Sequence, residues 1–458
     1  MKMLNKLTLL AIVWSLPLLL GQLDVNISFG ETATAQEKKK QERKKTRRVP
    51  AMRERTYKKL AEAQIMIDPE SAPREEGEPP PEPTGTPQDA IRLLTKLRGS
   101  KGLNSYEHAQ IWNTLAFAYY TLEDVPNTIR SYEQILKQGT ITEALEMTSM
   151  RALFQLYYAE EDYRRSIQYI DRWQALQAKP DPGVTFIKST AYYQLENFRE
   201  SLRWAIRVEE IATEQQREIK ENWWYLQVVL YNELQDPDNV IRVLETLIAY
   251  YPKKRYWMYL AGMYSEKEWD DKSLSAYYAA YAQGFLARES EVVMLSQRLL
   301  GAAVPYEAAQ IMEKGFKEGL IKENEKNLTL LATAYTMAQE TNSAIDAWRD
   351  ATKYAEDGDL HYRLAQALAQ EDRHKEAIQA YTAAQKKGDT KDPDDIAFWK
   401  GISQMQLERW NGATRSFRDA AKLGDKKMKR QTRKYIRYIA GEKRRQRELR
   451  KMLEDVGE

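Results

Sequence analysis

The sequence predicts an all-α fold that is built from repeated pairs of helices. Good helix formers such as Ala, Leu, Glu, Gln, Lys and Arg dominate the chain, whereas Gly and Pro number only 20 and 16. Small and aromatic residues recur together at intervals of 33 to 39 residues between about residues 109 and 424. No β-rich segment stands out. At 458 residues the chain also exceeds the usual size of one compact domain, which favours a repeat array.

The first 35 residues have the pattern of a secretory signal peptide. Lys2 and Lys6 precede an apolar run over residues 7–20, and the small residues at 33–35 form the predicted cleavage site. This run is shorter than the roughly 20 residues that span a bilayer. We therefore expect an exported, periplasmic protein, with an uncleaved inner-membrane anchor as the alternative.

A basic tether and a helical cap are predicted next. Residues 36–59 contain 12 basic and 3 acidic residues, and we interpret residues 36–48 as a disordered tether. Residues 49–108 are predicted to form an N-terminal cap of two helices, separated by a proline-rich acidic insertion at residues 69–87. Such a cap covers the apolar face that the first unit of an array would otherwise expose.

The repeat is clearest in the unit that begins at residue 254. Small residues at positions 8, 20 and 27 of a 34-residue pattern let two helices approach closely, and large residues at positions 4, 7, 11 and 24 fill the space between units. In this unit seven positions match, at 4, 7, 8, 11, 20, 24 and 27: Trp257, Leu260, Ala261, Tyr264, Ser273, Tyr277 and Ala280.

The residue at position 20 gives the spacing of the whole array. Its successive occupants are Thr128, Ser166, Ser201, Val240, Ser273, Ala308, Ala344, Ala377 and Ala413. They predict about nine units over residues 109–424, with small loop insertions. The third unit departs most from the pattern, since Lys188 and Ser189 stand at its positions 7 and 8.

Residues 425–458 are predicted to form a basic C-terminal capping helix. Residues 426–451 contain 13 basic and 2 acidic residues, and Tyr435, Ile436 and Ile439 recur among them at helical spacing. Both ends of the chain are thus basic. We expect anionic membrane lipids or acidic proteins as their partners and no nucleic acid, because an exported chain meets little of it.

The first helix of each unit would line a concave groove, where positions 5, 9 and 12 are rich in aromatic and amide side chains in the front half of the array. Aromatic rings supply contact area at low entropy cost, and amides pair with a peptide main chain. The alternative is that these residues only pack the helices together. The predicted groove residues are Asn113, Phe117, Tyr120, Arg151, Gln155, Tyr158, Phe186, Tyr193, Tyr225 and Asn232.

The sequence holds no pattern that indicates catalysis or cofactor binding. There is no cysteine, and the three histidines, His108, His361 and His374, form no metal-binding motif. Phosphate-binding glycine loops and the nucleophile motif Gly-x-Ser-x-Gly are also lacking. We therefore predict a non-enzymatic protein without cofactor or metal.

The repeat resembles the tetratricopeptide repeat (TPR) family over more than two thirds of the chain. The resemblance implies a TPR α-solenoid, a right-handed superhelix of helix-turn-helix repeats that binds protein or peptide partners. The layout of signal peptide, basic stretch and Arg53–Tyr57 helix start further resembles periplasmic TPR proteins of TonB-type energy-transducing systems in gammaproteobacteria. That group implies an accessory scaffold for iron-siderophore uptake, with TonB-complex components as partners.

Two other functions fit the same sequence. A scaffold for envelope assembly, serving polysaccharide, pilus or outer-membrane protein machinery, would use the same groove for different partners. An enzyme of glycan metabolism is the less favoured alternative, because it would need a cleft with perturbed carboxylates.

Overall fold

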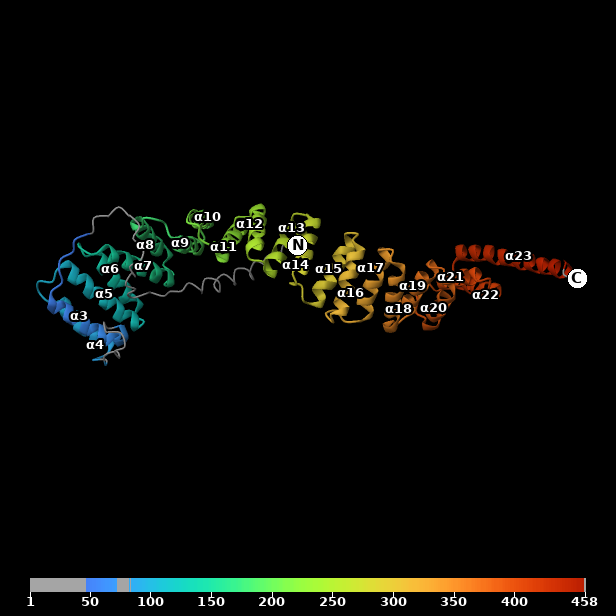
Figure 1. Cartoon of the computed structure of the whole chain (residues 1–458), viewed down its shortest axis with the longest axis horizontal. Coiled ribbons are helices and arrows are strands. Elements are labelled where there is room, and N and C mark those ends of the chain that lie inside the picture. Colours follow the sequence, from blue (N-terminus) through green and yellow to red (C-terminus); the bar gives the residue numbers. More distant parts are fainter. Residues whose placement is uncertain (1–46, 72–81, 83, 457–458) are drawn as a thin grey trace. The chain divides into compact units, whose positions relative to one another are not determined.

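The computed structural model describes residues 47–71, 82 and 84–456, and their regular elements are all helical (Figure 1). The predicted signal peptide lies outside the described residues, as do residues 36–46 of the tether and most of the proline-rich insertion. The described residues fall into two compact units, and the division between Leu247 and Ile248 lies within a helix.

The first unit contains the cap and the first repeats. Its helices are α3 (Glu54–Ile67), the 3-10 turn η1 (Pro69–Ser71), α4 (Pro87–Arg98), α5 (Ser105–Thr121), α6 (Val125–Leu136), α7 (Glu143–Ala159), α8 (Tyr163–Leu176), α9 (Pro182–Gln194), α10 (Phe198–Glu214), α11 (Glu221–Glu233) and most of α12 (Pro237–Tyr250). α3 and α4 pack on each other and on α5, so the two helices expected before the repeats are present as a pair.

The second unit contains the remaining repeats and the C-terminal helix. Its helices are α13 (Lys254–Glu266), α14 (Asp270–Ala282), α15 (Glu289–Gly301), α16 (Pro305–Lys317), α17 (Glu325–Met337), α18 (Thr341–Ala351), the 3-10 turn η2 (Thr352–Tyr354), α19 (Asp359–Gln370), α20 (His374–Lys387), α21 (Pro393–Gln406), α22 (Trp410–Leu423) and α23 (Lys426–Val456). From α5 to α22 the described helices form nine consecutive pairs.

The predicted register of the repeats is confirmed by burial. Every position-20 residue, from Thr128 on α6 to Ala413 on α22, lies on the second helix of its pair with at most 1% of its surface exposed. Where this residue is serine, its hydroxyl donates a hydrogen bond to the carbonyl twelve residues earlier. The three bonds run from Ser166 to Phe154, from Ser201 to Ser189 and from Ser273 to Ala261, at 2.8 to 2.9 Å.

The turn inside each pair has a backbone feature that the sequence pattern did not reveal. Five residues before each position-20 residue, the chain adopts a left-handed conformation with φ between 53° and 61°. Glycine adopts this conformation at no steric cost, yet none of these nine turns has a glycine there. The residues are Glu123, Glu161, Glu196, Gln235, Glu268, Ala303, Gln339, Asp372 and Glu408.

Two expectations about boundaries need correction. α5 begins at Ser105 and not at residue 109, so the first repeat helix is one turn longer than predicted. The extra residues between units were expected in loops, but α7 and α10 each take up part of them by extending to 17 residues. Helix extension lets the insertion keep its backbone hydrogen bonds.

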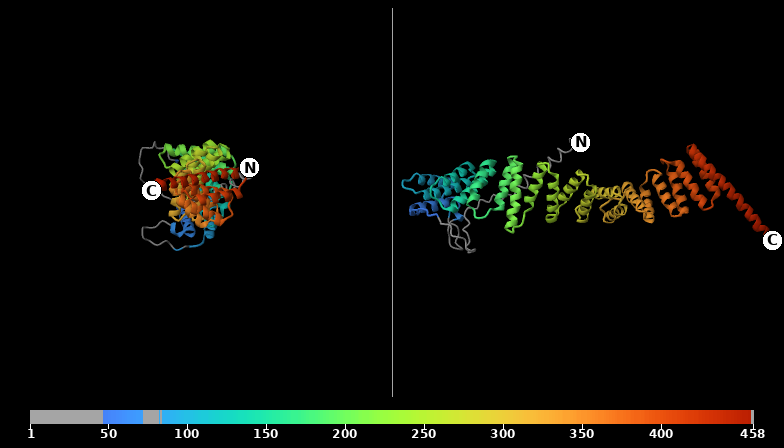
Figure 2. Two further views of the ribbon diagram at one scale, coloured as in Figure 1. Left: turned by 90° about the vertical axis from the view of Figure 1, so that its right-hand side faces the viewer. Right: turned by 90° about the horizontal axis from the view of Figure 1, so that it is seen from above.

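α23 closes the last repeat as a cap. Met428 and Ile439 are buried against the core of α21 and α22, and the ring of Tyr435 stacks on Phe417 with centroids 5.2 Å apart. The later turns of α23 extend beyond α21 and α22 (Figure 1, Figure 2). Among the described residues, no helix combines the length and apolar character that membrane crossing requires.

Candidate functional site

The ten predicted groove residues all lie on first helices of their pairs in the first unit. Nine of them keep part of their surface exposed, with Arg151 the most open. By helix they are Asn113, Phe117 and Tyr120 on α5, Arg151, Gln155 and Tyr158 on α7, Phe186 and Tyr193 on α9, and Tyr225 and Asn232 on α11. Their role in binding stays a prediction.

Phe186 is the exception, because it belongs to the core. It is 5% exposed and its ring centroid lies 6.3 Å from that of Trp223 on α11. Position 5 of this unit faces the next repeat more closely than the pattern implies, since the ring fills space between α9 and α11. We therefore remove Phe186 from the candidate binding surface.

Two of the tyrosines also serve packing. Tyr158 meets Tyr163 of α8 edge-on at 5.3 Å between centroids, and Tyr193 lies 5.6 Å from Phe198 of α10. Burial raises the pKa of Tyr158 to about 12 and also raises the pKa of Tyr193. Each ring thus packs against the second helix of its own pair, so these two tyrosines help to hold the helices together.

The unusual Lys188 of the third unit is held by two partners. Its side chain is buried, yet its amino group pairs with Asp171 of α8 and lies 3.5 Å from the ring centroid of Trp204. A cation over an indole face and beside a carboxylate is stabilised by both contacts. Lysine at position 7 of α9 therefore makes polar contacts with both α8 and α10, which a leucine side chain could not make.

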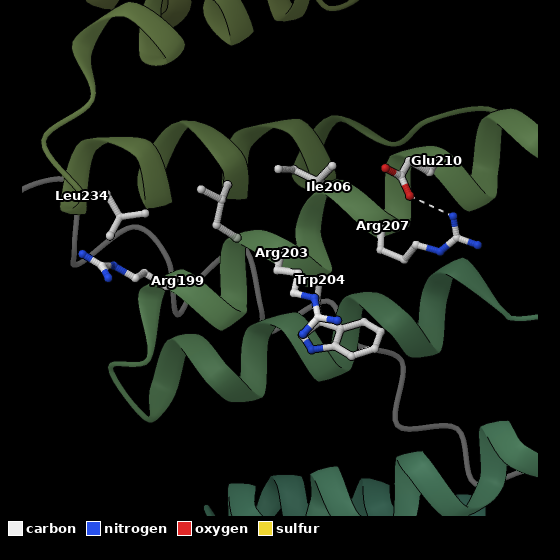
Figure 3. Close-up of a pocket in the computed structure, with 8 residues that line it drawn as sticks. Arg199, Arg203, Trp204, Ile206, Arg207, Glu210 and Leu234 are labelled. Atoms are coloured by element: carbon white, nitrogen blue, oxygen red, sulfur yellow. Dashed lines mark hydrogen bonds and ion pairs between the residues drawn. The ribbon is translucent and has the colours of Figure 1, made fainter.

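A hollow of about 680 Å³ lies along α10 and is lined by Arg199, Arg203 and Arg207 together with Trp204 (Figure 3). Arg207 pairs with Glu210 at 2.8 Å and with Glu214 at 3.1 Å, and Arg203 pairs with Glu200 at 3.5 Å. Two of the three arginines are thus balanced by carboxylates of their own helix. This surface is therefore a weak candidate for an anion site.

The strongest candidate site is a cavity of about 1000 Å³ in the second unit, which we call the rear groove. Most of its lining comes from the first helices of the last three repeats, α17, α19 and α21, and much of that part stands at the positions that the pattern assigns to the concave face. The residues that stand at these positions and line the rear groove are Thr329, Thr333, Thr336, Met337, Asp359, Tyr362, Gln366, Ala369, Gln370, Ile402 and Gln406.

The sequence pattern favours the front half of the array as a binding surface, because threonine and alanine replace its aromatic residues at the concave positions of this half. In the structure these smaller side chains leave the space that forms the rear groove. Two larger apolar side chains stay open beside it, Met337 at 50% and Trp399 at 43% exposure. A search for rows of small polar residues at the concave positions would have found it.

Two polar atoms beneath the rear groove have no hydrogen-bond partner among the described residues. They are the Nδ1 atom of His374 and the hydroxyl of Thr329, and both are buried. Nearby, Trp348 Nε1 donates to Thr336 Oγ1 at 3.1 Å. Both unpaired atoms lie beneath the surface of the groove, so the groups that a ligand can reach are the exposed hydroxyl and amide side chains.

The charge of the rear groove is mainly acidic. Five carboxylates face two basic side chains on its walls: Glu325, Asp357, Asp359, Asp372 and Asp392 against Arg363 and Lys391. Lys391 contacts Asp359 at 3.7 Å, which neutralises one acid. Among the described residues, no three acids or histidines come together in a way that could hold a metal ion.

The central part of the rear groove coincides with a recognised repeat sequence. The model of the tetratricopeptide repeat family matches residues 329–396. Residues 329–396 thus carry the tetratricopeptide repeat. No curated protein matches it.

Several solved structures resemble parts of the chain at low sequence identity. The MamA protein matches with a TM-score of 0.32 and 16% identity over 38% of this chain and 90% of that chain. YrrB, described as a TPR protein with an unusual peptide-binding site, matches with a TM-score of 0.32 and 16% identity over 42% of this chain and 97% of that chain. A tetratricopeptide repeat protein from Parabacteroides merdae ATCC 43184 matches with a TM-score of 0.32 and 10% identity over 57% of this chain and 99% of that chain.

TPR units of this kind are suited to protein-protein interaction, and the rear groove has the size and chemistry for it. Its walls offer hydroxyl and amide groups for hydrogen bonds together with exposed apolar side chains at Met337 and Trp399.

Proposed function

We propose that the chain is a non-catalytic adaptor that holds an extended peptide segment of a protein partner in the rear groove. The observation that carries this proposal is the lining of the groove by small polar and amide side chains from three successive first helices. Gln366, Gln370 and Gln406 offer both donors and acceptors, which suits the alternating N–H and C=O groups of a peptide main chain. Trp399 and Met337 supply apolar area at the walls.

The cellular setting that we propose is the bacterial envelope. The apolar run at residues 7–20 and the small-residue triplet at 33–35 support export to the periplasm. On this proposal the mature chain begins at Gln36, and N-terminal sequencing of the purified protein would show it. An N-terminus that retains Lys2 would instead indicate an uncleaved inner-membrane anchor.

Within the envelope, we favour an accessory role beside a TonB-type complex in iron-siderophore uptake. The support is the sequence layout, in which a basic stretch leads into the helix that starts at Arg53. A scaffold for polysaccharide, pilus or outer-membrane protein assembly is the alternative. Loss of growth on an iron-siderophore source in a deletion strain would favour the first role, and normal growth there with a defective envelope would favour the second.

Peptide selection tests the binding proposal directly. The purified chain would be exposed to a library of random peptides, and the affinity of the selected peptides would then be measured by calorimetry. Replacing Thr333 by Trp fills the rear groove and should weaken binding at least about 10-fold by excluding the peptide. The matched control is Thr382→Trp on the exposed face of α20, which should leave the affinity unchanged. Equal affinities for both variants would reject the rear groove as the site.

A further inference from the structure

A second cavity, of about 590 Å³, lies between α21 and α23, and we call it the basic cleft. Its charged side chains are all basic: Lys427, Arg430 and Lys434. Gln431, Tyr435, Tyr438 and Met405 complete the lining. None of the three basic side chains forms an ion pair with a described carboxylate, although Lys427 lies within electrostatic range of Asp395. The cleft is therefore a concave surface of net positive charge beside aromatic rings.

The basic cleft is a built feature of the cap helix, since its lining recurs at helical spacing. Residues 427, 430, 431, 434, 435 and 438 share one face of α23, and Tyr435 on this face is anchored by its stack on Phe417. Tyr438 next to it is 54% exposed. A rigid basic face with an open ring is suited to bind carboxylates and to cover the apolar part of the same ligand.

The basic cleft and the rear groove use neighbouring residues of one helix. Met405 of α21 lines the basic cleft, whereas Ile402 and Gln406 line the rear groove. The two cavities have opposite charge, because the rear groove is mainly acidic and the cleft is entirely basic. A peptide that lies in the rear groove and continues past α21 therefore meets a reversal of charge.

We propose that the basic cleft binds an acidic stretch of the partner polypeptide, adjacent to the segment that occupies the rear groove. This inference rests on the proposed function, because it assigns both segments to one partner. Lys427 and Lys434 are seven residues apart, which is about 10 Å along a helix. An extended chain covers that distance with about three residues, so a run of three or four Asp or Glu residues matches the cleft.

A polypeptide fits this site better than a membrane surface does. α23 carries other exposed basic residues, among them Lys426, Lys429 and Arg433, on a face that does not line the cleft. A flat bilayer would contact this outer face as well, and its headgroups would not need the cleft. A narrow acidic chain can enter the cleft and place its carboxylates against Lys427, Arg430 and Lys434 together.

The experiment measures fluorescence anisotropy of a labelled octaglutamate peptide with the full chain, and in parallel the retention of the chain on vesicles that contain phosphatidylglycerol. The cleft variant is Lys427→Ala/Arg430→Ala/Lys434→Ala. Its matched control is Lys426→Ala/Lys429→Ala/Arg433→Ala, which removes the same charge from the same helix. Circular dichroism would establish that both variants keep the helicity of the wild type.

We expect the cleft variant to bind octaglutamate at least about 10-fold more weakly, as three partly screened charge pairs imply, and the control to change less than about 2-fold. Equal weakening in both variants, or no binding by the wild type, would overturn the inference. The inference would also be overturned if both variants lost octaglutamate binding and also lost vesicle retention to the same extent. Thr333→Trp should leave octaglutamate binding intact, so failure of the rear groove and failure of the basic cleft give different results.

Discussion

The Nε atom of Arg53 lies 3.0 Å from Oε1 and 3.2 Å from Oε2 of Glu107, which joins the N-terminal cap to the first repeat. Glu107 is fully buried in the first turn of α5 and also accepts hydrogen bonds from the Thr56 hydroxyl at 2.6 Å and from the Asn104 backbone at 3.0 Å. The sequence start that we associated with TonB-type proteins thus has a structural task, because two of its residues, Arg53 and Thr56, dock on Glu107.

Low pH should weaken the contact between the N-terminal cap and α5. Burial by itself raises the pKa of Glu107, but the donors from Arg53, Thr56 and Asn104 outweigh it and hold the pKa at about 2, against an ordinary value of 4.5. The carboxylate therefore stabilises the docked cap above about pH 4.5, by on the order of 2 kcal/mol, and this contribution is lost as the pH falls toward 2.

The measurement compares wild type with Glu107→Gln by hydrogen exchange of the α3 amides, corrected for the intrinsic pH dependence. At pH 7 the variant should open its cap more readily, and this difference should shrink markedly as the pH falls from 4.5 to 2.5. A difference of the same size at pH 7 and pH 2.5 would show that the charge of Glu107 has no part in docking.

Gly401 should be intolerant of a side chain. It stands at position 8 of the last repeat, and a Cβ atom there would come within 2.9 Å of the Phe417 ring. Gly401→Ala should lower the free energy of unfolding by about 1–3 kcal/mol through overpacking. Gly441→Ala on α23 is the control, since nothing lies within 4 Å, and it should raise stability by about 0.5–1 kcal/mol. Urea unfolding checks both, and a neutral Gly401→Ala would refute the close approach of α21 and α22.

The left-handed turn residues should accept glycine with a gain in stability. Gln339 has φ of 61°, so Gln339→Gly should raise the free energy of unfolding by up to about 1 kcal/mol, because a strained backbone is relieved. Gln379→Gly makes the same chemical change at an exposed position inside α20 and should cost about 1 kcal/mol. Thermal melts of the two variants that shift in the same direction would contradict the assigned turn geometry.

Tyr158 should matter for stability whether or not it binds a partner. Its edge-on contact with Tyr163 leads us to expect that Tyr158→Ala lowers the free energy of unfolding by about 2–4 kcal/mol. Arg151→Ala on the same helix should stay within about 0.5 kcal/mol, since the side chain is exposed. Denaturant unfolding followed by circular dichroism measures both. An unchanged unfolding midpoint for Tyr158→Ala would show that the ring contributes nothing to packing.

The repeat architecture was predictable because its chemistry is local. Position 20 must be small wherever two helices cross closely, so the row from Thr128 to Ala413 reported the register of each described pair. The left-handed turn residues were not predictable from type, because the hydrogen bonds that close the first helix hold residues other than glycine in a conformation that glycine usually adopts. Lys188 was read as a departure, since its partners Asp171 and Trp204 come from neighbouring helices.

The candidate site was less predictable, because a groove is defined by the side chains that are missing. Aromatic residues drew attention to the front half, where Phe186 proved to be core and Tyr158 to be a packing residue. The rear groove arises where Thr329 and Thr333 leave space, and the volume that small residues leave depends on how far apart their helices lie.

Site-specific photo-cross-linking from the rear groove tests the central claim most directly. A photoreactive residue would replace Gln366 on the wall of the groove or, as control, Gln379 on the exposed face of α20, and the cross-linked segments would be identified by mass spectrometry from cells that produce the full chain. We predict that Gln366 captures one recurring peptide segment of an envelope protein, that this segment adjoins a run of acidic residues, and that Thr333→Trp abolishes the capture. Equal capture from Gln366 and Gln379, or capture that Thr333→Trp leaves unchanged, would contradict the account.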